Sequence, residues 1–204
     1  MSKKPIIVFE GIESSGKSYH INNVANYLKK KNIQFIKIRE PGGSKNSEKI
    51  RKLILNNTST FNKHTDLLLY LSARSENIDL IKNNFKKKII LIDRFTDSTL
   101  AYQHYGMGID IKFIKIINNF LLRNIKITFT FLNLVNQKNM KERLKKRKNL
   151  NRYDKFNSIF YKKVQNGFLK IFKLNSKKYM KINSNLDINQ NKKIILNKID
   201  DLIL

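Results

Sequence analysis

The stretch GIESSGKS, residues 11 to 18, constrains the fold more than any other feature of this sequence. It has the form G-x-x-x-x-G-K-[ST], it follows directly on the apolar run IIVFE, and it opens a stretch with helical periodicity. A glycine-rich loop between a strand and a helix wraps nucleotide phosphates with its backbone N–H groups and with the positive end of the helix. We therefore expect an α/β fold in which this loop binds a nucleoside triphosphate together with Mg²⁺. The loop alone leaves the reaction open.

The side chains of this loop have expected roles of their own. Lys17 is expected to reach the β- and γ-phosphates, and Ser18 is expected to ligate Mg²⁺. The alternative, a glycine-rich turn without a ligand, rarely combines this spacing with a preceding strand and a following helix. The residues predicted to bind the triphosphate are Gly11, Ile12, Glu13, Ser14, Ser15, Gly16, Lys17 and Ser18.

Apolar runs of strand length alternate with helical stretches along the chain. The predicted strands are residues 6–10, 35–39, 89–93, 127–132 and, more weakly, 179–182. The predicted helices include residues 17–31, 111–123, 155–173 and 188–203. This alternation predicts a parallel sheet of about five strands with helices on both faces. The segment LLLYLSAR, residues 67–74, is apolar on all sides, which predicts a helix buried between the sheet and something else, such as a second subunit.

Length and composition favour one compact domain in the cytoplasm. The 204 residues are 41% hydrophobic, and no linker or repeat marks a boundary, so we expect a single domain over residues 1–204. The absence of cysteine excludes disulfides, thiolate zinc sites and cysteine nucleophiles, and it suits a reducing compartment. The first apolar run stops at Glu10, too early for a signal peptide or a membrane span.

The net charge of +27 has two interpretations. A nucleic-acid-binding surface is one of them. However, the lysines are spread along the whole chain among many Asn and Ile residues, as a compositional drift toward A- and T-rich codons would give. The chain also lacks a basic stripe interleaved with aromatic residues. We favour the drift and expect no nucleic-acid partner.

Eight arginines persist among the 42 basic residues. Because lysine serves solubility equally well, a retained arginine suggests bidentate contact with an anion. Four of them lie in segments that can reach the carboxyl edge of the sheet, where open α/β folds bind ligands: Arg39, Arg51, Arg74 and Arg94. Each alone suits a surface ion pair, but together they predict a second phosphate site facing the loop. Asp93, beside them at a strand end, is expected to hold the water shell of Mg²⁺.

The segment MKERLKKRKNLNRYDK, residues 140–155, is strongly basic. A solvated charge run, or a patch that resembles a nuclear localisation signal, is one interpretation. Arg143, Arg147 and Arg152 nevertheless persist among its lysines, and this favours a mobile lid whose arginines reach a transferred phosphoryl group.

These motifs together resemble the bacterial type of thymidylate kinase. The motifs that carry the resemblance, in order, are FEGIESSGKS, REPGG, LYLSAR, DRFTDSTLAYQ with GMGI after it, and RLKKRKNLNRY. They cover residues 6 to about 170. The resemblance implies transfer of the γ-phosphoryl of ATP to dTMP, giving dTDP for dTTP synthesis, with Mg²⁺, on a nucleoside-monophosphate-kinase fold that is usually a homodimer. Two alternatives stay open, namely another nucleoside or nucleotide kinase and a nucleic-acid-binding P-loop ATPase.

The resemblance also implies which residues bind dTMP. The arginine matching Arg94 binds the acceptor phosphate, and the arginine matching Arg74 reaches the thymine carbonyl. Tyr102 matches a tyrosine that lies against the sugar, and Tyr70 stands where the family usually has a Phe stacked on thymine. The full set is Glu13, Glu40, Arg51, Tyr70, Arg74, Arg94, Ser98, Thr99, Tyr102 and Gln103, in which Glu13 and Glu40 match acids near the 3′-hydroxyl and the metal, and Ser98, Thr99 and Gln103 match positions that read the pyrimidine edge.

The family divides by whether its catalytic arginine lies in the P-loop or in the lid. Ser14 and Ser15 leave the P-loop of this chain without an arginine, so it resembles the lid-arginine class. The predicted catalytic residues are Lys17, Arg94, Arg143 and Arg147. We expect His104, in the unusual stretch HYG, to face solvent, and Gly106 and Gly108 to let the chain turn away.

Overall fold

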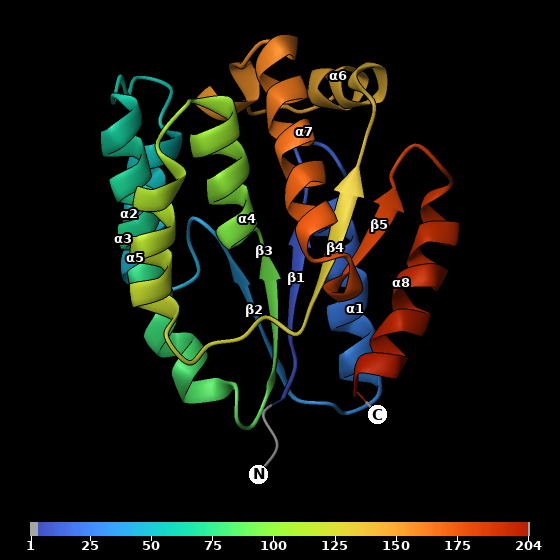
Figure 1. The fold of residues 1–204 in the computed structure, drawn as a ribbon. Helices are drawn as coiled ribbons and strands as arrows, with labels where there is room; N and C mark the ends of the chain where they lie inside the picture. The colour runs from blue at the N-terminus through green and yellow to red at the C-terminus, as the bar shows by residue number, and fades with distance from the viewer. Residues whose placement is uncertain (1–3, 204) are drawn as a thin grey trace.

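A computed structural model describes residues 4–203, which form a five-stranded sheet with helices around it (Figure 1). The strands are β1 (Ile6–Glu10), β2 (Phe35–Arg39), β3 (Ile89–Asp93), β4 (Phe129–Leu134) and β5 (Tyr179–Asn183). They lie in the order β2-β3-β1-β4-β5, and all neighbouring strands are parallel. The predicted α/β class and the five-stranded parallel sheet are therefore confirmed.

The helices cover both faces of the sheet (Figure 1). They are α1 (Lys17–Lys30), α2 (Lys45–Leu55), α3 (Lys63–Asn84), α4 (Thr96–Thr99), the π-helix η1 (Leu100–Gly106), α5 (Ile111–Leu122), α6 (Gln137–Lys145), the 3₁₀-helix η2 (Arg152–Lys155), α7 (Ser158–Leu174), the 3₁₀-helix η3 (Ser176–Lys178) and α8 (Ile188–Ile203). No helix within residues 4–203 has the length and apolarity that crossing a membrane would require.

The alternation of side chains along β1 explains the two layers. Ile7 and Phe9 pack with α1 and α8 on one face of the sheet, whereas Ile6 and Val8 pack with α3 on the other. Every residue of β1 is buried, as expected for the central strand of a parallel sheet that is covered on both sides. Burial on both faces is why the strand is a continuous apolar run in the sequence.

Two predicted element boundaries are wrong by a few residues. β4 covers residues 129–134 rather than 127–132, because its pairing with β5 extends to Leu134 opposite Asn183. α7 begins at Ser158 rather than at residue 155, because the Asn157 side chain caps it by accepting a hydrogen bond from the Phe160 amide. Side-chain caps fix the start of η2 and the start of α7, and the apolar periodicity carries no information about them.

Residues 67–74 are helical as predicted, and the expectation that something beyond the sheet, such as a second subunit, covers their other face stays a prediction. They lie inside α3, where Leu67 and Leu71 are buried but Leu68 is 50% exposed. The helix therefore has an apolar residue on its outward face as well as on its inward face. A run of leucines cannot distinguish these two positions, since both are apolar.

The π-helix η1 packs closely against α7, and glycines allow this contact. A Cβ atom on Gly106 would lie 2.7 Å from the Phe160 ring, and one on Gly167 would lie 2.6 Å from the Tyr105 ring. Gly106 therefore serves close packing, whereas Gly108, with φ +74°, serves the predicted turn. His104 does not face solvent as predicted. It is half-buried, and its Nδ1 lies 2.7 Å from the carbonyl oxygen of Ile109.

Candidate active site

A pocket of about 390 Å³ opens at the carboxyl edge of the sheet. Residues from the loop after β1, the ends of β2 and β3, α3, η1, α6 and the segment around η2 line it. All the predicted site residues line this pocket except Gly11, Ile12 and the lid residue Arg152. Gly11 packs against the backbone of β4, and Ile12 is part of an apolar cluster with Leu132. The structure thus brings the two predicted halves of the site together.

The loop of residues 11–18 has backbone geometry that requires glycine. Gly11 has φ +138°, and a Cβ atom there would collide with the carbonyl oxygen of Asn133 in β4. Gly16, with φ +87°, immediately precedes α1, so the loop ends at the N-terminus of a 14-residue helix. This places the unpaired N–H groups of the helix start at the pocket, where they favour an anion.

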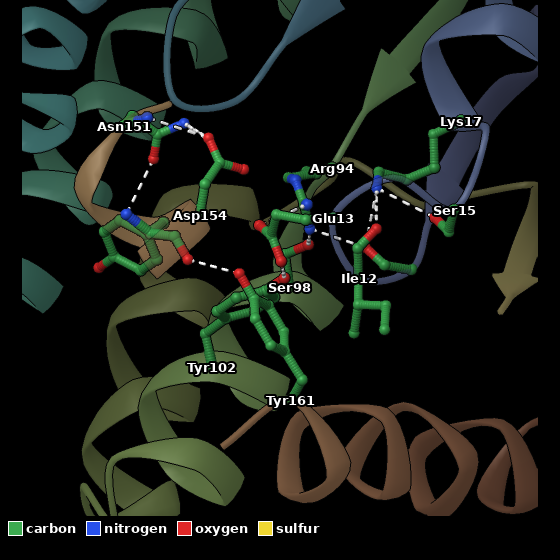
Figure 2. Close-up of polar contacts among 12 residues, drawn as sticks. Ile12, Glu13, Ser15, Lys17, Arg94, Ser98, Tyr102, Asn151, Asp154 and Tyr161 are labelled. Carbon is green, nitrogen blue, oxygen red and sulfur yellow. Dashed lines mark hydrogen bonds and ion pairs between the residues drawn. The ribbon is translucent and has the colours of Figure 1, made fainter. Parts of the chain in front are cut away.

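Lys17 is folded over the same loop (Figure 2). Its ammonium group donates hydrogen bonds to the carbonyl oxygens of Gly11 at 2.9 Å and Ile12 at 2.7 Å, and to Ser15 Oγ at 3.3 Å. Burial, and then the charge of Arg94, lower the pKa of Lys17 to about 7. A polyanion beside the ammonium group would reverse this shift, because it favours the charged form.

Ser18 and Asp93 both line the pocket and contact each other. The Ser18 hydroxyl donates a hydrogen bond of 2.9 Å to Asp93 Oδ2, which connects the start of α1 to the end of β3. A hydroxyl and a carboxylate are oxygen donors of the kind that Mg²⁺ takes, and this ion keeps waters and substrate phosphates as its other ligands. Two protein oxygens therefore fit the predicted magnesium site.

Arg94 is held in a fixed position in the centre of the pocket. Its Nη1 donates to the Gly11 carbonyl oxygen at 2.8 Å, and its Nη2 donates to Glu13 Oε1 at 2.9 Å. The other oxygen of Glu13 accepts a short hydrogen bond from the Tyr102 hydroxyl, and the guanidinium lies 5.3 Å from the centre of the Tyr102 ring (Figure 2). Burial lowers the pKa of Arg94, but the interactions with Tyr102 and with the nearby carboxylates raise it by more. The net shift is upward, so the guanidinium stays charged.

Arg74 forms a buried ion pair with Glu40. The arginine side chain is 1% exposed, and its Nη2 lies 2.7 Å from Glu40 Oε2. Its Nη1 donates to Asn118 Oδ1 at 2.7 Å, and its Nη2 donates to Thr99 Oγ1 at 2.9 Å. Burial raises the pKa of Glu40 in spite of the nearby Arg74. This network holds the Arg74 guanidinium in one orientation in the wall of the pocket.

Asn77 and Asn118 complete this network, and sequence reasoning missed both. Asn77 donates to the Gly42 carbonyl oxygen at 2.7 Å and lies three residues after Arg74, on the same face of α3. That helical spacing is a signal that could have identified it. Asn118 lies on α5, and no spacing along the chain relates it to Arg74.

The other two predicted phosphate-site arginines differ in their environments. Arg51 is partly buried and donates to the Pro41 carbonyl oxygen at 2.6 Å. Burial, and then the charge of Arg39, lower the pKa of Arg51. Arg39 is largely exposed and pairs with Glu48 at 2.9 Å. Arg51 is thus the better placed of the two to contact an anion in the pocket.

The lid arginines fall into two groups. Arg143 lines the pocket and donates to the carbonyl oxygens of Ser14 at 3.2 Å and Ser184 at 2.7 Å. Arg147 also lines the pocket, and it pairs with Asp154 at 2.6 Å. Arg152 does not line the pocket, because it pairs with Asp66 of α3 and so fastens the end of the lid to the body of the protein.

Three further residues from the lid, Asn151, Tyr153 and Asp154, line the pocket and were not predicted. Tyr153 is buried, and its ring stands edge-on to Tyr70 with 5.7 Å between the ring centres. Asp154 caps its own 3₁₀-helix together with Asn151 (Figure 2). Burial raises the pKa of the Tyr70 hydroxyl, and a hydrogen bond with Tyr153 offsets part of this increase. The hydroxyl that Tyr70 adds therefore has a partner.

Comparison with known proteins identifies the relatives of this chain. The family model described as thymidylate kinase matches residues 9–195. The thymidylate kinase of Thermosipho africanus is 41% identical over 170 residues, covering 82% of this chain and 84% of that protein. The thymidylate kinase of Sulfurihydrogenibium sp. is 37% identical over 196 residues, 95% of each chain. A crystal structure of thymidylate kinase from Ehrlichia chaffeensis superposes with a TM-score of 0.78 at 29% identity, covering 98% of this chain and 99% of that one.

Proposed function

Because the chain belongs to the thymidylate kinase family, we propose that it phosphorylates dTMP to dTDP with the γ-phosphoryl group of ATP. Family membership makes it a nucleoside monophosphate kinase. One observation supports the specific reaction: the P-loop and a set of arginines from other elements line the same pocket. A transfer between two phosphorylated nucleotides needs a cationic site for each of them, whereas an ATPase needs only the first.

The donor half of the site is the P-loop with its helix. Backbone N–H groups of residues 13 to 18 hold the ATP phosphates, and Lys17 leaves the loop carbonyls to contact them. Ser18 and Asp93 are the residues that would hold Mg²⁺, Asp93 through water. When bound, this ion neutralises charge that develops on the phosphates. Arg143, which lies against the P-loop at Ser14, extends the donor site toward the lid.

The acceptor half lies around Arg94. Arg94 and Arg51 bind the dTMP phosphate, and Glu13 and Tyr102, which already share a hydrogen bond, lie against the sugar. Glu40 supports this region through Arg74. Tyr70 stacks on thymine, while Arg74, Ser98, Thr99 and Gln103 form the wall that meets the polar edge of the base.

Catalysis in this site is positioning and electrostatic stabilisation. An oxygen of the dTMP phosphate forms a bond to the γ-phosphorus of ATP as the bond to the bridging oxygen breaks, and ADP leaves with that electron pair. Lys17, Arg94 and Arg147 spread the charge of the transferred group. The lid excludes water, so that hydrolysis does not compete.

We also propose that the protein is a cytoplasmic homodimer of single-domain subunits. The helices α2, α3 and α5 lie side by side at one edge of the molecule (Figure 1). All three expose large apolar side chains, namely Leu53, Leu68, Phe113, Ile116 and Phe120. Apolar residues concentrated on neighbouring helices are typical of an interface between subunits. Size-exclusion chromatography with light scattering tests this proposal, and a monomer at micromolar concentration would contradict it.

A coupled ADP-release assay with dTMP, dUMP, AMP and thymidine as acceptors tests the reaction. We expect the highest kcat/KM with dTMP, and equal rates with the other monophosphates would contradict the proposal. The net charge of +27 invites the alternative of a nucleic-acid-dependent ATPase. That alternative requires that DNA stimulates ADP release and that this stimulation falls steeply as the salt concentration rises. The relatives named above, all thymidylate kinases, give it no support.

A further inference from the structure

Glu10 is a fully buried carboxylate at the end of the central strand, and the mechanism above does not use it. Its exposed fraction is 0%, and its carboxylate faces the turn between β3 and α4 rather than the pocket. Oε1 accepts hydrogen bonds from the Phe95 amide at 2.7 Å and from the Ser98 amide at 3.2 Å. Oε2 accepts one from the Ser98 hydroxyl at 2.5 Å. A buried carboxylate with three donors is a defined structural element.

The first consequence is that Glu10 caps α4 from a neighbouring strand. The residue at the start of this helix, Phe95, has no side chain that can accept a hydrogen bond. Helix starts leave N–H groups unpaired, and a carboxylate there pairs them and interacts favourably with the helix dipole. Glu10 supplies this cap although it lies more than eighty residues earlier in the chain.

The second consequence concerns the backbone of Arg94. Its φ of +64° is left-handed, a conformation that non-glycine residues adopt only where the surroundings hold them. The Arg94 amide donates to the Phe9 carbonyl oxygen at 3.0 Å, and the next amide, that of Phe95, donates to Glu10. Both sides of the left-handed residue are thus fastened to the last two residues of β1.

The third consequence concerns the Arg94 side chain. The Ser98 hydroxyl has one hydrogen, which it donates to Glu10, so toward other groups it can only accept. It accepts from Arg94 Nη1 at 3.3 Å. Figure 2 shows Ser98 and Arg94 lying together beside Glu13. The carboxylate therefore determines the direction of the hydroxyl, which in turn contacts the guanidinium.

We propose that Glu10 is a positioning residue that orients Arg94, through the α4 cap and the Ser98 hydroxyl, for binding of the acceptor phosphate. This proposal rests on the role of Arg94 proposed above. It gives Ser98 a task besides contact with the base, since its hydrogen is committed to Glu10. If Glu10 only stabilised the fold, its loss would weaken the binding of dTMP and thymidine alike. If it positions Arg94, its loss should weaken the binding of dTMP, which carries the phosphate, more than that of thymidine.

The test compares binding of dTMP and thymidine by titration calorimetry in Glu10→Gln, Ser98→Ala and Arg94→Ala. Glutamine keeps an oxygen for the Phe95 amide but offers an N–H group where Ser98 needs an acceptor. We expect the Kd for dTMP to rise about tenfold, the effect of one hydrogen bond to a charged group, while the Kd for thymidine stays within about twofold. The same fold-change is expected in the KM for dTMP but not in the KM for ATP.

A matched control is Tyr179→Phe. It removes a hydrogen bond of 2.7 Å to Asp97, the buried carboxylate of the same helix, without touching Glu10 or the Arg94 turn. We expect it to lower Tm and to leave the preference for dTMP over thymidine unchanged. If Glu10→Gln does not fold, Ser98→Ala breaks the link between Glu10 and Arg94 at the hydroxyl. Because Ser98 is also proposed to meet the base, the comparison is then the ratio of the two Kd values, and dTMP should lose more affinity than thymidine.

The double variant Glu10→Gln/Arg94→Ala separates the two proposals. If Glu10 acts through Arg94, the double variant loses no more dTMP affinity than Arg94→Ala alone. Should Arg94→Ala leave the preference for dTMP over thymidine intact, the proposed role of Arg94 is wrong. Should Arg94→Ala abolish that preference while Glu10→Gln and Ser98→Ala retain it, the inference about Glu10 alone is overturned.

Discussion

The hydroxyl of Tyr153, which belongs to the lid, donates a hydrogen bond of 3.0 Å to the buried carboxylate of Asp66 at the start of α3. The same carboxylate pairs with Arg152, so two consecutive lid residues share one anchor. The lid is therefore joined to the acceptor side of the pocket, beside Tyr70, and not only to the donor side. The position of the lid therefore depends on Asp66, which belongs to none of the motifs identified in the sequence.

Asp66→Asn should loosen this anchor. The pair is mostly buried, so we expect a loss of about 2 kcal/mol or more of stability, because Arg152 is left without its counter-charge. We also expect a lower kcat with dTMP and more ATP hydrolysis without it, since a displaced lid admits water. Thermal unfolding and ADP release with and without dTMP measure these effects. The control Asp200→Asn removes an exposed ion pair with Lys31 and should change neither rate.

Arg94→Ala should reduce kcat/KM for dTMP by about 100-fold or more, because it removes a buried, hydrogen-bonded charge from the acceptor site. Arg123→Ala provides the comparison, since Arg123 follows α5 outside the pocket lining and stacks on Phe120. It should retain the activity of the wild type within about twofold. Equal losses in both variants would mean that Arg94 has no special role.

Tyr70→Phe should leave the KM for dTMP within about twofold, because the ring that we propose to stack on the base remains. The hydroxyl interacts with Tyr153 rather than with an empty part of the pocket, so its loss should lower Tm slightly. Tyr70→Ala removes the ring and should raise the KM at least about tenfold. A large KM change in the Phe variant would show that the hydroxyl itself contacts the substrate.

Stability should depend on pH through Glu10. Burial, and then the charge of Asp97, raise the pKa of Glu10 from 4.5 to about 7, whereas Ser98, Phe95 and Arg94 act in the opposite direction. The native state therefore holds a proton that the unfolded chain has already lost between these pH values. The free energy of unfolding of the wild type should fall from pH 4.5 to pH 7 relative to Glu10→Gln. Urea unfolding of both proteins at pH 5 and pH 7.5 measures the difference, and parallel curves would contradict it.

Gly167→Ala should destabilise the protein by about 1 to 3 kcal/mol through overpacking. Alanine favours helices by up to about 1 kcal/mol over glycine, so an isolated helix would predict the opposite sign. The contact with Tyr105 decides the outcome, because a new Cβ would lie 2.7 Å from the Cβ of that tyrosine, which cannot swing away. In the background Tyr105→Gly, which removes this Cβ together with the ring, the same substitution should be neutral or stabilising.

The sequence predicts the parts of this fold that depend on local patterns. The P-loop and the apolar runs of β1, β2 and β3 have the predicted bounds because strand burial and loop geometry are determined by adjacent residues. The roles of Glu10 and Asn118 could not be predicted, since each depends on which elements the topology makes neighbours. The π-helix was missed for a related reason. Its contact with α7 depends on Gly106 and Gly167, which are far apart in the chain.

The central place of β1 has a consequence for how selectivity can change. The P-loop continues from this strand, and the last two residues of the same strand fasten the Arg94 turn. In the proposed reaction, the separation between the donor and acceptor phosphates is thus determined by one central strand. The groups proposed to meet the base, such as Tyr70 and Gln103, are carried by α3 and η1 instead. A change of nucleobase preference can therefore arise in those helices without altering the distance over which the phosphoryl group is transferred.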